Sequence, residues 1–238
     1  MSEKGRIERA AKRAARETAK KTAEPKVADG KHAVVYYNTG TKCLVRMIVS
    51  MYSLRKVWHG DILAVLEGPT PEWVFNAFHA LKVRCKRVEF KLPDFKGIKS
   101  ALVRKPYVPD FVESDAAVFL DNDTVVLQPL DKLFELPDGI TFGTTAFSDW
   151  KEQGRTMSGR INPWKPVSGG YEPHKDRPAI NTGVFCWKRG SEFVKTWQTM
   201  TVAGARHPEF GQGSTIMADE IGAQVLLERK VVAVFASR

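Results

Sequence analysis

The stretch that most constrains the fold is an unbroken apolar run ending in two acidic residues. The apolar residues extend from Ala116 to Leu120, Asp121-Asn122-Asp123 follow them, and the stretch continues with Thr-Val-Val to Val126. A run without polar alternation predicts a strand covered on both faces, as in the middle of a mostly parallel sheet. Ligands of such sheets bind beyond the carboxyl ends of the strands. We therefore expect Asp121 and Asp123 to lie at a ligand site.

The spacing of the two acids is compatible with a metal site. In an extended chain, side chains two residues apart point to the same side. Two carboxylates suit Mg²⁺ or Mn²⁺, which use few protein carboxylates and take further ligands from substrate phosphates. A simple turn after the strand explains the same residues equally well, because Asp and Asn favour turns. From these residues alone, both interpretations stay open.

The rest of the folded region alternates between predicted strands and helices. β-branched and aromatic runs predict strands at 32–37, 61–66, 87–90, 140–143, 180–187 and 231–235. Apolar spacing and turn residues predict helical segments at 42–56, from 71 onward, at 99–105, 131–136, 193–197 and 217–228. This alternation indicates an α/β fold with a single, mostly parallel, Rossmann-like central sheet flanked by helices.

Composition adds a tail and some exclusions. Residues 1–30 contain mainly Lys, Arg, Ala and Glu, so we expect a basic, disordered tail before one domain at 31–238, with a nucleic-acid or membrane-surface arm as the alternative. The net charge of +10 attracts phosphates of any kind. There is no transmembrane segment or signal peptide, and the three cysteines lack metal spacing, so we expect a soluble, cytoplasmic protein.

One long segment has no regular pattern. Residues 148–178 are rich in glycine, proline, tryptophan and tyrosine. Long loops inside compact domains are usually functional or disordered, and exposed aromatic rings are common platforms for sugars. We predict that this loop forms part of the acceptor side.

The motifs, taken in order, resemble a known family. A strand with a polar tip, the Asp-Asn-Asp element, Asn-Thr-Gly-Val at 181–184 and a late Asp-Glu pair are similar to the glycogenin-type nucleotide-sugar glycosyltransferases of family eight. The resemblance covers about residues 33–235. It implies the GT-A fold, Mn²⁺ or Mg²⁺ as cofactor, a donor such as a UDP-sugar, and a hydroxyl acceptor on carbohydrate or protein. The family retains stereochemistry, but inversion stays open, because Asp219 or Asp149 could act as a base.

The resemblance also implies roles for individual residues. Asp121 and Asp123 match the metal ligands. Positions that match donor-binding residues are Tyr36, Asn38, Thr39, Asn122, Gly183 and Glu220, and positions that match catalytic residues near the sugar, acceptor or phosphates are Asp219, Asn181 and Lys105.

These positions also have simpler explanations. Without the family, Tyr36, Asn38 and Thr39 form an ordinary strand end, the segment around Asn181 forms a bulge, and Asp219-Glu220 caps a helix N-terminus. Glu220 stands where the family usually has Gln.

The resemblance leaves the third metal ligand open. In relatives a histidine beyond the equivalent of Arg238 completes the site. Either this sequence is a trimmed domain of a longer protein, or His174 or His207 replaces that histidine, or the metal has only the two carboxylates.

Two other function classes fit less well. A sugar nucleotidyltransferase would carry a Gly-rich loop after the first strand, and residues 38–42 are a poor version of it. A basic nucleic-acid-binding protein agrees with the charge, but no nucleic-acid motif or phosphate-binding loop is present, so we expect no nucleic-acid partner.

Overall fold

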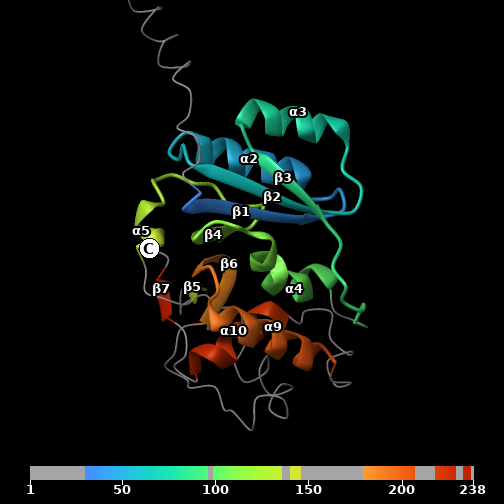
Figure 1. Cartoon of the computed structure of the whole chain (residues 1–238), viewed down its shortest axis with the longest axis vertical. Helices are drawn as coiled ribbons and strands as arrows, with labels where there is room; N and C mark the ends of the chain where they lie inside the picture. The colour runs from blue at the N-terminus through green and yellow to red at the C-terminus, as the bar shows by residue number, and fades with distance from the viewer. Residues whose placement is uncertain are drawn as a thin grey trace, which may run out of the picture.

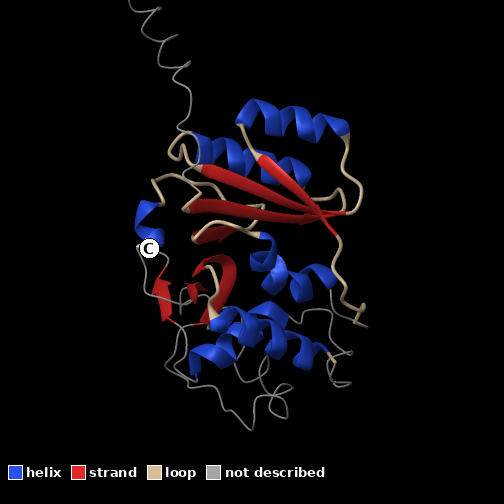
Figure 2. Ribbon diagram, in the orientation of Figure 1, coloured by secondary structure: helices blue, strands red, loops and turns tan. Residues whose placement is uncertain are grey.

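The described part of the chain is built around one seven-stranded sheet with helices on both faces (Figures 1 and 2). The computed structural model describes residues 30–95, 99–135, 140–145, 179–206, 218–228 and 233–236. The strands are β1 (His32–Thr39), β2 (Asp61–Glu67), β3 (Arg84–Val88), β4 (Ala116–Leu120), β5 (Ile140–Thr145), β6 (Ala179–Lys188) and β7 (Ala233–Ala236). The helices are α2 (Leu44–Arg55), α3 (Glu72–Leu81), α4 (Ser100–Arg104), α5 (Asp131–Phe134), α9 (Glu192–Ala205) and α10 (Ala218–Glu228), with a 3₁₀ helix, η1 (Lys105–Phe111).

The strand order places β4 at the centre of the sheet. Neighbouring strands follow the order β3-β2-β1-β4-β6-β5-β7. β4 pairs in parallel with β1 and antiparallel with β6, with Phe119 opposite Phe185. Because β5 is antiparallel to β6 and parallel to β7, β6 runs against the other described strands. The amino-terminal part of β6 therefore lies at the sheet edge where the parallel strands end.

The central run is buried on both faces, as its sequence predicts. All five residues of β4 are buried. Phe119 packs into a cluster with Trp197 of α9 and Leu226 of α10. Val118 packs into a second cluster with α2 and α3. Helices cover both sides of the sheet, which confirms the predicted α/β class, with α2 and α3 on one face and α9 and α10 on the other (Figure 1).

Several boundaries differ from those predicted. The third strand lies at Arg84–Val88 instead of 87–90, because its charged, largely exposed residues carry no clear burial signal. The central strand ends at Leu120, directly before the acids as predicted, and residues 121–126 form a turn and loop. The helical region at 99–105 continues as η1, which contains Pro109.

Other predictions fall outside the described residues. These are the basic tail, apart from Gly30, the loop at 148–178, and the two histidines proposed as third metal ligands. No helix in the described part of the chain is long and apolar enough to cross a membrane.

Candidate active site

The site forms where the end of β4 meets the beginning of β6. The Asp121 N–H donates a hydrogen bond of 2.8 Å to the carbonyl oxygen of Gly183. This contact places the Asp-Asn-Asp element beside the Asn-Thr-Gly segment, although the two are far apart in the sequence. The antiparallel direction of β6 is what brings the two motifs together.

A buried lysine joins two of the predicted carboxylates. Lys105, at the junction of α4 and η1, places Nζ 2.9 Å from Asp121 Oδ1 and 3.3 Å from Asp219 Oδ2. The Asp219 side chain is fully buried, whereas that of Asp121 is 37% exposed. The hydroxyl of Thr182 donates to Asp219 Oδ2 over 2.6 Å. Lys105, Asp121 and Asp219, which are far apart in the sequence, thus form one charged cluster.

The backbone of α10 is fixed at the same point. Trp197 Nε1 on α9 donates to the carbonyl oxygen of Asp219 over 2.8 Å. The other carboxylate oxygen of Asp219, Oδ1, is buried without a hydrogen-bond partner among the described residues. Asp219 is therefore anchored by both backbone and side chain in the first turn of α10, where a helix dipole favours an acid.

Electrostatics in this cluster favour a permanently charged lysine. Burial alone would lower the pKa of Lys105, but Asp219 and Asp121 together raise it well above its ordinary value. Burial raises the pKa of Asp121, and Asp219 and Asp123 raise it further, while Lys105 opposes these effects. The site combines one cation with several acids, so it has capacity for additional positive charge.

The carboxylates of Asp121 and Asp123 have the donor chemistry that a divalent cation needs. Lys105 engages Oδ1 of Asp121, which leaves Oδ2 for another partner. Oδ2 faces Gly183, where a Cβ atom would lie 3.0 Å from it. Asp123 is exposed two residues later. These hard oxygen donors match Mg²⁺ or Mn²⁺.

The described residues supply only part of a coordination shell. They contain no group of three or more His, Cys, Asp or Glu side chains that could hold a metal. Ions of this class commonly complete their coordination with water and substrate phosphate oxygens. The two carboxylates are therefore compatible with a substrate-assisted metal site.

Asn122 connects the tips of β4 and β1. Its Nδ2 donates to the Tyr37 carbonyl over 2.9 Å and to Asn38 Oδ1 over 3.0 Å. Asn38 in turn donates to the Gly40 carbonyl over 2.6 Å. Asn122 Oδ1 is buried without a partner in the described part of the chain. Both asparagines thus shape the loops, and Thr39 is exposed beside them.

Tyr36 has a different environment from its predicted neighbours. Its side chain is fully buried, and its hydroxyl lies 2.9 Å from Ser50 Oγ on α2. Burial raises the pKa of Tyr36 to about 12. The aromatic ring therefore lies in the core between β1 and α2, and the structure presents no exposed ring surface for a nucleotide base. A donor contact would have to use the backbone at this position.

Sequence reasoning missed the hydroxyl chain that starts at this tyrosine. Ser50 Oγ also lies 2.8 Å from Thr124 Oγ1, which donates to the Asp121 carbonyl over 2.9 Å. Ser53 Oγ, one helical turn further, accepts from Val126 N–H over 2.9 Å. Helix α2 thus holds the loop that carries the acids. Ser50 is a polar residue on the buried face of α2, and this is the signal that could have identified it.

The Asn-Thr-Gly segment contains the bulge that the simpler explanation anticipates. The register between β5 and β6 shifts, so that Phe142 faces Phe185 while Gly143 faces Asn181. Asn181 is exposed, and its Oδ1 accepts a hydrogen bond from Gly183 N–H over 2.8 Å. Glu220 is buried next to Asp219 in α10. The bulge and a ligand-facing role for Asn181 are compatible.

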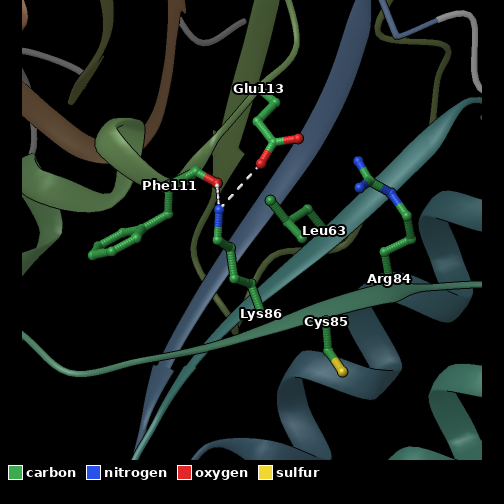
Figure 3. Close-up of a pocket in the computed structure, with 6 residues that line it drawn as sticks. All are labelled: Leu63, Arg84, Cys85, Lys86, Phe111 and Glu113. Carbon is green, nitrogen blue, oxygen red and sulfur yellow. Dashed lines mark hydrogen bonds and ion pairs between the residues drawn. The ribbon is translucent and has the colours of Figure 1, made fainter.

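A separate cavity lies away from this cluster. It has a volume of about 360 Å³ and is lined by Leu63, Arg84, Cys85, Lys86, Phe111 and Glu113 (Figure 3). Arg84 pairs with Asp61, and Lys86 contacts Glu113 and the Phe111 carbonyl. Its cations are already neutralised, so the predicted residues at the end of β4 form the stronger candidate site.

Comparisons with known proteins place this geometry in a structural class. No protein-family model and no curated protein matches the sequence. Solved structures do match: galactosyltransferase LgtC in complex with donor and acceptor sugar analogues has a TM-score of 0.55 at 12% identity over 85% of this chain and 72% of LgtC. The chain has the GT-A fold.

Two further structures agree. An active-site mutant of LgtC gives a TM-score of 0.58 at 13% identity, again over 85% of this chain and 72% of LgtC. The glycosyltransferase GlyE from Streptococcus pneumoniae TIGR4 gives 0.57 at 17% identity over 86% of this chain. The chain spans only 45% of the length of GlyE. The expected fold is confirmed, and the likeness is to glycosyltransferases of this fold in general.

Proposed function

We propose that the protein is a metal-dependent glycosyltransferase that moves a hexosyl group from a UDP-sugar to a hydroxyl of a carbohydrate or protein acceptor. The observation that carries this proposal is the Asp121–Lys105–Asp219 cluster beyond the end of the central strand in a GT-A sheet. The bound sugar analogues of LgtC support sugar chemistry for this fold.

The two acids of the Asp-Asn-Asp element are proposed as the metal ligands. Asp121 Oδ2 and Asp123 would hold Mn²⁺ or Mg²⁺, which, when bound, stabilises negative charge on a diphosphate leaving group. Gly183 keeps the approach to Asp121 open, because a side chain there would meet that carboxylate. Asn122 keeps the loop in place through its bonds to the β1 tip.

Lys105 is proposed as the cation that assists departure of the nucleotide. An ammonium has three protons, and two are directed at Asp121 and Asp219. The third can donate to an oxygen of the sugar or the diphosphate. Because the neighbouring acids raise its pKa, Lys105 stays positively charged throughout. Its charge offsets the negative charge that develops on the leaving group.

Asp219 supports this lysine from inside the protein. Its carboxylate is fully buried and accepts from Thr182, so we assign it to orienting Lys105, in place of the position near the sugar that the family resemblance implies. Asn181 and Thr39 are exposed at the same edge and are the proposed polar contacts to sugar and nucleotide.

We include retention of stereochemistry in this proposal. An inverting enzyme needs a carboxylate base free to deprotonate the acceptor. Within the described residues of the site, Asp121 and Asp123 are assigned to the metal, while Asp219 and Glu220 are buried.

We propose the cytoplasm as the location of the protein. Its free cysteines, Cys43, Cys85 and Cys186, agree with a reducing compartment.

A donor panel tests the proposal. The protein would be incubated with UDP-, GDP- and other nucleotide sugars and Mn²⁺, and release of the nucleotide would be measured. We expect release from a UDP-sugar that stops with a chelator and with Asp123→Asn. Asp115→Asn changes an exposed acid before β4 and should have no effect. Release from no donor in the panel, or release unaffected by chelator, would argue against this function.

A further inference from the structure

Helix α2 presents an apolar outer face that the proposed chemistry does not use. Most exposed large apolar side chains in the described part of the chain come from α2 and from the loop after Asp123. On α2 these are Val45, Val49 and Tyr52, which are 63%, 54% and 56% exposed. Their spacing of four and three residues aligns them along one side of the helix. The opposite side of α2, which includes Met47, Met51 and Leu54, packs on the sheet.

The loop after the acids extends this face. Val125 and Leu127 are 63% and 81% exposed, while Val126 between them packs inward. The bonds from Ser50 to Thr124 and from Ser53 to Val126 hold the loop against α2. We call Val45, Val49, Tyr52, Val125 and Leu127 together the apolar face.

Cations border the apolar face. Lys42, Arg46 and Lys56 are exposed at and around α2. Helix α2 contains no acidic residue. Lys56 lies over the Tyr52 ring, with its Nζ 4.7 Å from the ring centroid. An apolar stripe with lysine and arginine at its margins is the composition of helices that lie in the plane of a membrane interface.

We propose that the apolar face docks on the surface of an anionic lipid bilayer. Helix α2 lies flat on the outside of the sheet, in the layer that it shares with α3 (Figure 1), so its outer side can lie along a membrane plane. Valine and leucine side chains would enter the headgroup boundary, Tyr52 would lie at the interface, and the bordering cations would meet lipid phosphates.

Charge complementarity favours lipid over a second copy of the chain. A twofold interface through this face would bring the cations of two α2 helices together, with no acid on either helix to pair with them. An anionic bilayer supplies the missing negative charge, and the chain's net charge of +10 acts in the same direction. This inference concerns a surface beside the candidate active site, formed by other residues, and it does not depend on the proposed function.

Vesicle sedimentation tests the proposal on the full chain, without donor or metal. Vesicles of phosphatidylcholine with phosphatidylglycerol would be compared with phosphatidylcholine alone. Val49→Asp lowers and Val49→Trp raises the affinity of the same position for a membrane interface. Because Val49 is exposed, both variants should keep the fold. Arg46→Gln with Lys56→Gln removes two bordering cations. Lys195→Gln, an exposed lysine on α9 across the sheet, is the matched control.

We expect binding to the phosphatidylglycerol vesicles and much weaker binding to neutral ones. Val49→Asp should weaken the binding at least about tenfold, and Val49→Trp should strengthen it, because tryptophan favours the interface. Each removed cation should cost about fivefold, which corresponds to about 1 kcal/mol. Lys195→Gln should bind like the wild type.

Three results would overturn the proposal. The first is no sedimentation with anionic vesicles at low salt. The second is equal binding by wild type, Val49→Asp and Val49→Trp, which would assign the binding to charge elsewhere, such as the basic residues 1–30. The third is a dimer in solution that Val49→Asp dissociates, which would assign the apolar face to a second copy of the chain.

Discussion

Replacing Lys105 with methionine should destabilise the protein strongly, because it removes the cation beside a fully buried carboxylate. Methionine keeps an apolar stem of similar length but loses the ammonium, whose Nζ lies 5.4 Å from the centroid of the Phe119 ring. Asp219 would lose its ion pair with no water to replace it, since its side chain is 0% exposed. Leaving one partner of a buried pair unpaired costs about 3–5 kcal/mol of the free energy of unfolding. Asp121 adds little to this cost, because its side chain is partly hydrated.

Urea denaturation of a double-mutant cycle measures this effect. Asp219→Asn in the Lys105→Met background removes the unpaired charge and retains an acceptor for Thr182, so it should restore most of the lost stability. Lys86→Met is the matched control: its pair with Glu113 is exposed, and its loss should cost less than about 1 kcal/mol. A loss below about 1 kcal/mol for Lys105→Met, or no recovery in the double variant, would refute this reasoning.

Three further predictions follow from individual contacts. Ser50→Ala should lower the free energy of unfolding by about 1–3 kcal/mol, since it removes the buried hydrogen bond between Ser50 and the Tyr36 hydroxyl. Urea denaturation measures this loss, and an unchanged midpoint would contradict it. Gly183→Ala should weaken Mn²⁺-dependent UDP binding, because the new Cβ would crowd the Asp121 carboxylate, and it should change the melting temperature little, because that Cβ meets only side-chain atoms. An unchanged affinity for UDP would show that Gly183 does not keep the site open. At pH 8, iodoacetamide should modify exposed Cys85 and spare Cys186, whose pKa burial raises to about 12; equal modification by mass spectrometry would mean that this strand opens.

The α/β class of the fold could be predicted because its signals are local, whereas the strand order and the antiparallel direction of β6 were not predicted. The uninterrupted apolar residues of β4 indicated a strand buried on both faces, and the acids after it indicated the end where ligands bind. The third strand was displaced because an exposed edge strand rich in Arg and Lys lacks the alternation that defines its limits. Its position is decided by pairing with β2, which no local pattern reveals.

The site was predicted less completely, because its geometry depends on which layer a side chain enters. Six consecutive residues of β1 are buried, so the sequence could not show that Tyr36 faces α2. Lys105 was identified only through the family resemblance, since neighbouring Arg104 and Lys99 are equally basic. Arg104 instead forms an ion pair of 2.8 Å with Glu67, which does not belong to the Asp121–Asp219 cluster. The supporting hydroxyls of Ser50 and Thr182 lie within apolar or turn patterns that conceal them.

The central claim is that Asp121 and Asp123 hold a metal that binds the donor diphosphate. The most direct test is calorimetric titration of UDP into the wild type, Asp121→Asn and Asp123→Asn, each with and without Mn²⁺, with Asp115→Asn as control. Asparagine keeps the size and turn-forming ability of aspartate but loses its charge. We predict Mn²⁺-dependent binding by the wild type and the control, and loss of that dependence in both site variants with the fold retained. If both site variants bind UDP with wild-type, Mn²⁺-dependent affinity, Asp121 and Asp123 only form a turn after the strand, and the proposed function is contradicted.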